Sequence, residues 1–378
     1  MWLVAALGGV VAVLTGAVPL DTAGSTLGRL APILVFLVAV TVLAELADGS
    51  GLFDVAAHAC ARWGRGSGWR LWLLVVALAT AATVLLSLDT TAVLLTPVVL
   101  ALADQLGLPP LGFAMTTVWL ANTASLLLPV SNLTNLLAQD SLELSTRAFA
   151  AASWPAALAA VVVTVAVLGV RYRRTWRTTY DVPPRTRVED RVLLGASAAA
   201  CLLLGPLVLL GLPVAGVALV LASGLALVFA VRRRAVLRVS LVPWRLVLLV
   251  AGLFLVVAAA RAHGLDAVLA GLTGSGDDAP ALLRLSGVAA AGANLVNNLP
   301  AYAALEPAAG GVTRMLALLV GVNTGPLVLL WGSLATLLWR ERCRARGLEV
   351  GWREFATTGL LGVPVVVVAG VLALAVAG

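Results

Sequence analysis

Long apolar runs recur along the whole 378-residue chain, and they constrain its fold more than any other feature. Each run has about 18 to 20 residues, the length that an α-helix needs to cross the hydrocarbon core of a bilayer. Only 11% of the residues are charged, whereas a soluble domain has about 25%. So few charges cannot cover the surface of a soluble globule of this size. The sequence therefore predicts an all-α integral membrane protein and excludes a soluble enzyme, a disulfide scaffold and a disordered chain.

The basic residues are 25 arginines, with no lysine, against 18 acidic residues. Most of the arginine lies in four loops between apolar runs, at 62–70, 171–191, 232–245 and 340–353. Cytoplasmic loops of membrane proteins carry an excess of positive charge, so we assign all four loops to the cytoplasm. The net charge of +7 then reflects membrane topology, and we expect no nucleic-acid partner.

Cys60, Cys201 and Cys343 lie far apart in the sequence, and none belongs to a CxxC or Cys/His motif. The two histidines, His58 and His263, sit beside short loops. This pattern indicates neither a metal site nor a disulfide framework, and we expect no cofactor.

The number of membrane crossings follows from placing the four arginine-rich loops on one side. If every run crossed once, loops 62–70 and 171–191 would fall on opposite sides. A re-entrant hairpin at 71–103 restores the agreement, and a second hairpin at 281–310 does the same later in the chain. We predict nine crossing helices in the plasma membrane, with a cytoplasmic N-terminus and an extracellular C-terminus. They lie at 2–20, 31–47, 111–139, 153–170, 192–211, 213–231, 245–260, 312–339 and 355–377.

Residues 119–137 and 320–338 are similar in sequence: Asn122-Thr123 aligns with Asn323-Thr324, and Ser131-Asn132-Leu133 with Gly332-Ser333-Leu334. Each segment follows a predicted hairpin, and the hairpins open to opposite sides, which is typical of an inverted-repeat secondary transporter. We therefore predict three parts. They are a first repeat at 1–170 (hairpin 71–103, broken helix 111–139), a cytoplasmic linker at 171–191, and residues 192–378, which hold an extra helix 192–211 and the second repeat (hairpin 281–310, broken helix 312–339).

Four polar stretches interrupt the apolar runs, at 87–91, 129–135, 294–300 and 323–336. Broken helices leave free amides and carbonyls at membrane depth, and Asn, Ser and Thr side chains add neutral donors and acceptors. Alternatively, these side chains hydrogen-bond the helices to one another. We predict that the substrate-binding residues are Thr90, Ser131, Asn132, Asn135, Asn297, Asn298, Asn323, Thr324 and Ser333.

Asp89 is the only charged residue between 71 and 103. A carboxyl group in apolar surroundings favours its protonated form, which suits a proton carrier. Alternatively, Asp89 caps the helix that returns from the hairpin turn, and both interpretations stay open. We expect Glu45 at the inner membrane boundary and Glu306 near the outer mouth of the second hairpin.

The interrupted segments resemble the ArsB-type arsenite efflux permeases, in the ion-transporter superfamily that also holds Na⁺/H⁺ antiporters and dicarboxylate symporters. The matching segments are AELADGSGLFDVAAHACARWG (44–64), LDTTAVLLTP (88–97), ANTASLLLPVSNLTNLLA (121–138), NLVNNLP (294–300) and GSLATLLW (332–339). Together they extend the resemblance over nearly the whole chain. Family members carry Asn-Asp-Gly where this chain has Leu88-Asp89-Thr90, and Asp-Thr where it has Asn122-Thr123, so one carboxylate is missing here.

The resemblance implies proton-linked export of arsenite or antimonite, alone or with an ATPase subunit, and it leaves a homodimer open. We predict a transporter and not an enzyme. Neutral As(OH)₃ or Sb(OH)₃ would bind to the five predicted asparagines between the hairpin tips, and Asp89 would carry the coupled proton. A Na⁺/H⁺ antiporter that binds its cation at Asp89, and an anion or dicarboxylate transporter, remain alternatives. The predicted pocket has no arginine, which disfavours the anion transporter.

Overall fold

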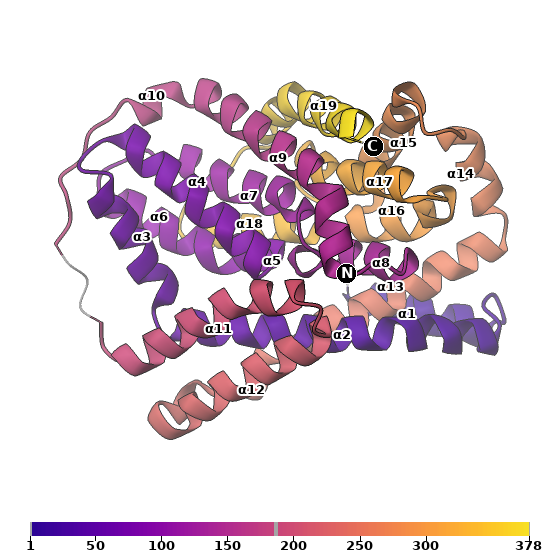
Figure 1. The fold of residues 1–378 in the computed structure, drawn as a ribbon, viewed down its shortest axis with the longest axis horizontal. Helices are drawn as coiled ribbons and strands as arrows, with labels where there is room; N and C mark the ends of the chain where they lie inside the picture. Colours follow the sequence, from indigo (N-terminus) through magenta and orange to yellow (C-terminus); the bar gives the residue numbers. More distant parts are fainter. Residues whose placement is uncertain (1, 185–187, 378) are drawn as a thin grey trace.

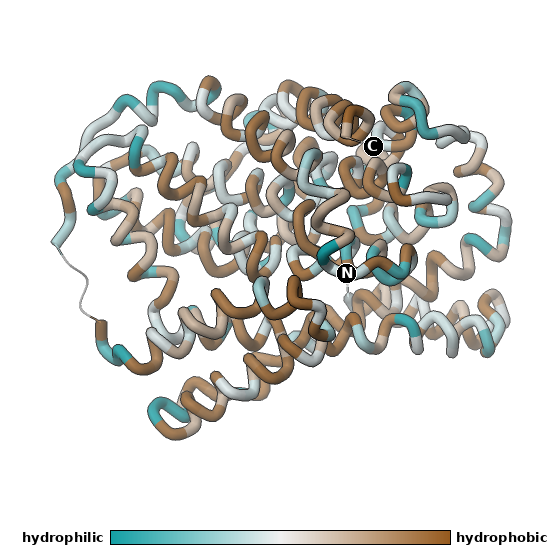
Figure 2. Tube along the Cα trace, viewed as in Figure 1, coloured by the Kyte–Doolittle hydropathy of each residue, from teal (hydrophilic) through white to brown (hydrophobic). Residues whose placement is uncertain are grey.

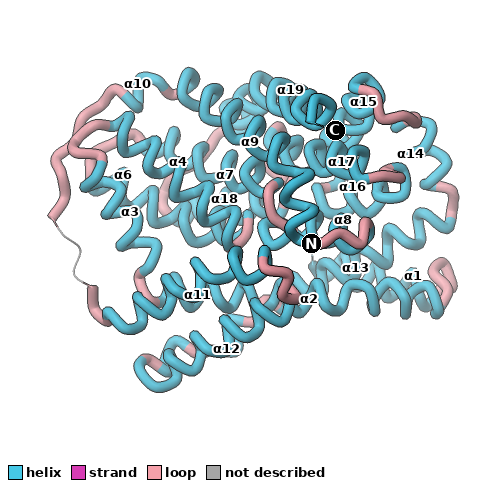
Figure 3. Tube along the Cα trace, viewed as in Figure 1, coloured by secondary structure: helices cyan, strands magenta, loops and turns pink. Residues whose placement is uncertain are grey.

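The computed structural model describes residues 2–184 and 188–377, so 185–187 of the predicted linker lie outside the described residues. The described chain consists of helices and connecting loops (Figure 3). An isolated antiparallel bridge joins Ser67 and Thr179. Nine of its helical segments are long and apolar enough to cross a membrane. The predicted all-α membrane fold is therefore confirmed.

The chain up to residue 171 begins with two helices that differ from the prediction. The run predicted at 2–20 is not a single helix, because Gly16 (φ +73°) and Pro19 interrupt it. Its 13 residues give α1 a length of about 20 Å, less than the bilayer core needs. The helices here are α1 (Trp2–Leu14), α2 (Leu20–Gly49), α3 (Leu52–Trp63), α4 (Gly68–Leu85), α5 (Leu88–Thr90), η1 (Thr91–Leu95), α6 (Thr96–Gln105), α7 (Pro110–Thr123), η2 (Ala124–Leu126), η3 (Pro129–Ser131), α8 (Leu133–Ser141) and α9 (Thr146–Arg171).

The rest of the chain contains the longest apolar helices together with a second set of short, interrupted ones. Hydrophobic residues predominate along α11, α12 and α19, and many hydrophilic residues lie at the turns at the two ends of the long axis (Figure 2). The helices are α10 (Arg173–Trp176), α11 (Arg191–Leu209), α12 (Val214–Arg232), η4 (Arg234–Val236), η5 (Val239–Leu241), α13 (Trp244–Ala262), α14 (Leu265–Thr273), α15 (Ala279–Val296), α16 (Asn298–Leu305), η6 (Glu306–Ala308), α17 (Val312–Thr324), η7 (Gly325–Leu327), α18 (Leu334–Ala345) and α19 (Trp352–Ala377).

The nine candidate spans are not the nine crossings that the sequence predicts. α4, the continuous run 88–105 and α15 are among the candidates, although we assigned these segments to hairpins. The predicted crossings 111–139 and 312–339 are absent from the candidates, because each is broken in the middle into two short helices. The two sets therefore agree in number but differ in their segments, and the number of crossings stays a prediction.

Two helix pairs approach the middle of the molecule from opposite ends (Figure 1). The first pair is α4 with the continuous run α5–α6, and both of its ends lie toward the end of the molecule that holds α3. Gly68 N, at its start, donates to Thr178 O of the linker at 3.0 Å, and Gln105 Oε1, at its end, contacts the His58 ring on α3 at 3.1 Å. The second pair, α15 and α16, lies toward the end of the molecule that holds α14. The turn of each pair therefore reaches the central region where α7–α8 and α17–α18 are broken.

Candidate functional site

The turn of the first helix pair presents Asp89 without a partner. Ser87 is the N-cap of α5, and its side chain accepts a hydrogen bond from Thr90 N at 3.1 Å. The capping interpretation of Asp89 is therefore wrong, since Ser87 already performs that role. Asp89 is half-buried, and its carboxylate makes no hydrogen bond or ion pair within residues 2–184 and 188–377. An unpaired carboxylate at this depth is a functional candidate by default.

Asp89 lies on the wall between two cavities. The inner cavity has a volume of about 780 Å³ and is lined by Asp89, Thr90, Glu45 and residues 240 and 242–246, which belong to one of the arginine-rich loops and to the start of α13. The middle cavity, of about 40 Å³, is lined by Asp89, Asn132, Asn297 and Asn298 among apolar side chains. The structure thus brings together four of the predicted site residues from both helix pairs and from the break between α7 and α8.

A buried cluster of amides lies beside the middle cavity and joins the two broken helices. Asn323 Oδ1 accepts hydrogen bonds from Asn132 Nδ2 at 3.0 Å and Thr134 Oγ1 at 2.8 Å. Asn323 Nδ2 donates to Asn135 Oδ1 at 2.8 Å, and Asn135 Nδ2 donates to the carbonyls of Ser125 and Leu128. Asn135 and Asn323 are fully buried and do not line the middle cavity, so in this conformation they hold the helices together.

The predicted serine and threonine residues bind the backbone around the breaks. Ser131 Oγ donates to Val84 O at 2.9 Å, which fastens the break of α7–α8 to the end of α4. Ser333 caps α18 by accepting from Thr336 N at 3.0 Å. Thr324 Oγ1 donates to Val320 O within its own helix, whereas Thr90 lines the inner cavity. Of these four residues, only Thr90 lines a cavity that Asp89 also lines.

The turn of the second helix pair has an unusual backbone conformation at Asn297. Its φ of +86° lies in the left-handed region, which costs free energy for a residue other than glycine. Two hydrogen bonds to the break of α17–α18 hold this turn: Asn297 Nδ2 donates to Trp331 O at 3.1 Å, and Asn298 N donates to Gly332 O at 2.9 Å. Each break is therefore bonded to the helix pair that precedes it in the chain.

The sequence prediction missed several residues that shape the site. Thr134 and Asn294 lie inside the polar stretches we quoted, and Asn294 bonds the break by donating to Gly325 O at 2.7 Å and accepting from Leu329 N at 2.9 Å. Glu45 and Arg245 line the inner cavity. The residues that line the middle cavity include no arginine, whereas Arg245 lines the inner cavity. The hydrophobic periodicity of the sequence does not identify Arg245 as a cavity residue, because it lies at the boundary between a basic loop and a helix.

The chemistry of the site combines neutral amides with a single unpaired carboxylate. Amide groups donate and accept hydrogen bonds without the cost of burying charge, which suits a hydroxylated neutral solute. The carboxylate can take up a proton or attract a cation. Among the residues described, no three His, Cys, Asp or Glu side chains are grouped closely enough to hold a metal ion.

An all-helical fold with nine candidate spans, and cavities whose polar lining residues lie at helix breaks, is typical of a multi-span membrane transporter. Residues 1–336 match the family described as "Citrate transporter" (CitMHS), and the chain belongs to this family. Membership agrees with the superfamily that the motifs indicated.

Curated relatives carry a more specific name. The "Arsenical pump membrane protein" of Yersinia enterocolitica is 33% identical over 353 residues, which cover 86% of this chain and 81% of that protein. The protein of the same name in Escherichia coli K12 is 32% identical, with the same coverage. These similarities confirm the resemblance to the arsenite permeases.

A solved structure supports the fold independently. The crystal structure of the YdaH transporter of Alcanivorax borkumensis superposes with a TM-score of 0.61 and 18% sequence identity. The match covers 94% of this chain and 87% of that one. The helical architecture is therefore shared with a known membrane transporter.

Proposed function

We propose that this chain is a secondary transporter that exports arsenite or antimonite across the plasma membrane in exchange for protons. The observation that carries the proposal is the position of Asp89, unpaired on the wall between the inner and middle cavities. The names of the relatives that are 32% and 33% identical support the arsenical substrate. No cofactor is required, because the proton gradient supplies the free energy.

In this mechanism the solute enters the inner cavity from the cytoplasm as neutral As(OH)₃ or Sb(OH)₃. Asn132, Asn297 and Asn298 line the middle cavity and supply both donors and acceptors for its hydroxyl groups. Asp89 binds the coupled proton and releases it toward the inner cavity. Asn135 and Asn323, which bond to one another, transmit rearrangement of one broken helix to the other. The chain performs this cycle alone or with an ATPase subunit.

The test is arsenite resistance of a sensitive host, together with pH-driven arsenite uptake into inverted membrane vesicles. Wild type should confer resistance and take up arsenite. Asp89→Asn should abolish both, because the amide side chain cannot carry a proton. The matched control is Asp104→Asn, which removes an exposed carboxylate from α6 in the same helix pair. This variant should leave resistance and arsenite uptake unchanged. Undiminished pH-driven uptake by Asp89→Asn would refute the proton-carrier role.

An anion transporter is the second candidate, because Arg245 lines the inner cavity and the family is described as "Citrate transporter". Liposomes that contain only the purified chain distinguish the candidates. Arsenite flux driven by a pH gradient supports the proposal, and citrate flux without arsenite flux supports the anion transporter. Sodium-driven proton flux without either solute would support a Na⁺/H⁺ antiporter.

A further inference from the structure

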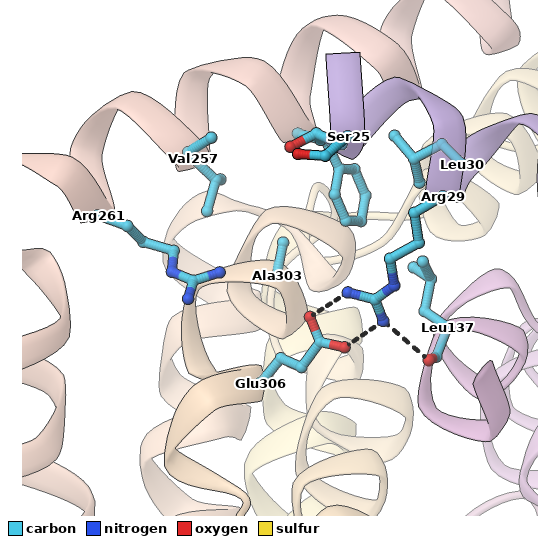
Figure 4. Close-up of a pocket in the computed structure, with 11 residues that line it drawn as sticks. Ser25, Arg29, Leu30, Leu137, Val257, Arg261, Ala303 and Glu306 are labelled. Carbon is cyan, nitrogen blue, oxygen red and sulfur yellow. Dashed lines mark hydrogen bonds and ion pairs between the residues drawn. The ribbon is translucent and has the colours of Figure 1, made fainter. Parts of the chain in front are cut away.

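A third cavity lies at the end of the molecule opposite to the arginine-rich loops. This outer cavity has a volume of about 260 Å³ and is lined by polar residues of α2 and by Arg261 and Glu306 (Figure 4). Arg261 pairs with Asp266 at 3.0 Å, and Arg29 points toward Glu306 across the cavity. The mechanism above does not use any of these charges.

The inner, middle and outer cavities follow one path along two helices. On α2 the path passes from Glu45 in the inner cavity to Leu37 in the middle cavity and Arg29 in the outer cavity. On α13 the residues that line the inner, middle and outer cavities follow in order at 244–249, 246–253 and 254–261. Two independent helices thus give the same order, which identifies a continuous axis through the protein.

The two short helices that flank the middle cavity extend the same order. Leu133 on α8 and Leu299 on α16 line the middle cavity, and Leu137 and Ala303, one turn further along, line the outer cavity. The middle and outer cavities have no lining residue in common. In contrast, the middle and inner cavities share Asp89 and three leucines, so the path is more open toward the arginine-rich loops.

A network of charges lies at the outer end of this path. Arg29 on α2 donates to Glu306 through Nη2 at 2.7 Å and Nη1 at 3.4 Å, and to Asp140 through Nε at 2.9 Å. Arg29 also donates to Leu137 O at 3.3 Å (Figure 4). One guanidinium therefore joins α2 to the end of α8 and to η6.

The Glu306 carboxylate is nearly buried and has several hydrogen-bond partners. Its side chain is only 9% exposed. Besides Arg29, it accepts hydrogen bonds from Ser141 Oγ at 2.7 Å and Tyr302 OH at 3.2 Å. A carboxylate so enclosed is stabilised by its partners, and removal of one partner leaves an uncompensated charge. Separation of α8 and η6 from α2 therefore requires this network to break.

We propose that Arg29, Asp140 and Glu306 form the outer gate of the transport path, and that this structure is the state in which the gate is closed. A solute in the middle cavity can leave at the outer end only after α8 and η6 move away from α2. Release of Arg29 from the two carboxylates permits that movement. The inference rests on the chain being a transporter and does not depend on arsenite as the substrate.

Cysteine labelling tests the gate without any substrate. Leu299→Cys places a thiol in the middle cavity, in a background where Cys60, Cys201 and Cys343 are replaced by alanine. A membrane-impermeant maleimide is applied to right-side-out and to inverted vesicles. Adding Arg29→Gln or Glu306→Gln should raise the labelling rate from the outer face about ten-fold, because the closed state loses its main charge contacts.

The matched control is Arg261→Gln, which lines the same cavity but pairs with Asp266 and stands outside the network. It should leave the labelling rate unchanged. Outer-face rates that are the same in all three variants would overturn the proposal.

A second measurement covers the case in which the glutamine variants fail to fold. The pair Arg29→Cys and Glu306→Cys is bridged with a bifunctional methanethiosulfonate, whose spacer replaces the length of the two lost side chains, since Arg29 and Glu306 meet only through their side-chain ends. The bridge should hold the gate shut and stop transport, and a reductant should restore it. Full transport by the bridged pair would contradict the gate. Because labelling of Leu299→Cys needs no solute, failure of the gate and failure of the arsenite proposal give different results.

Discussion

Asn323 connects two segments that lie far apart in the chain, and its contacts allow a precise test at the scale of one residue. It bonds to Asn132, Thr134 and Asn135, all of which are buried. Asn122 occupies the aligned position in the first half, where its Oδ1 is buried without a partner and its Nδ2 donates to Val118 O. The aligned asparagines therefore have different structural roles.

Asn323→Ala should destabilise the protein and abolish transport, because it leaves buried polar groups without partners at a cost of about 1–3 kcal/mol each. Asn122→Ala should cost less, since it breaks one hydrogen bond within its own helix. Thermal unfolding of both variants in detergent, together with vesicle uptake, measures the difference. Equal losses of stability would show that the cluster does not join the helices as described.

At the scale of elements, the same local arrangement occurs on both sides of the site. Asn132 and Ser333, which align between the two halves, each cap a helix, through the amide of Thr134 and the amide of Thr336 respectively. Each break is bonded to its preceding helix pair, through Ser131 to Val84 in the first half and Asn298 to Gly332 in the second. We propose that these matching contacts reflect two inverted repeats, the first at 1–170 and the second within 192–378, after the extra helix 192–211. The polar stretches made these elements predictable, because Asn, Ser and Thr favour helix starts and breaks.

Glycines in the breaks allow helices to approach closely. A Cβ built on Gly325, at the start of η7, would lie 2.5 Å from Ala290 Cα and Cβ on α15. Gly325→Ala should therefore lower the unfolding free energy by about 1–3 kcal/mol through overpacking. Gly287→Ala, in α15 itself, meets nothing within 4 Å and should be neutral or stabilising. Denaturation of the two variants measures the difference in unfolding free energy. An unchanged unfolding free energy in Gly325→Ala would mean that α15 moves away to accommodate the added methyl group.

At the scale of the whole molecule, the arginine-rich loops and the C-terminus lie toward opposite ends. Arg171 pairs with Glu354 at 2.7 Å, so α19 begins beside the linker. From there α19 runs 26 residues, a length of about 39 Å, to Ala377. The N-terminal helix α1 starts beside α13, where Arg245 lies 5.9 Å from the centre of the Trp2 ring. We propose a cytoplasmic N-terminus and an extracellular C-terminus on this basis.

Reporter fusions test the proposed orientation. An enzyme that is active only outside the cytoplasm should be active when fused after Gly378. The same enzyme fused after Arg346, in the loop 340–353, should be inactive, because positively charged loops stay in the cytoplasm. The opposite pattern would show that the proposed orientation in the membrane is reversed. The inner cavity would then face the outside of the cell and the outer cavity the cytoplasm.

The sequence by itself determined the class of the fold, the positions of the helix breaks and the isolation of Asp89. Those features depend on local hydropathy, on proline and glycine, and on residue type. Only the tertiary structure decided that Asn323 bonds to Asn132 and Asn135, that α1 is too short to span, that Arg245 lines the inner cavity, and that Glu306 binds Arg29. The physical reason is that side-chain partners are chosen by packing between segments far apart in the chain. A periodic pattern along one helix carries no information about which distant helix lies against it.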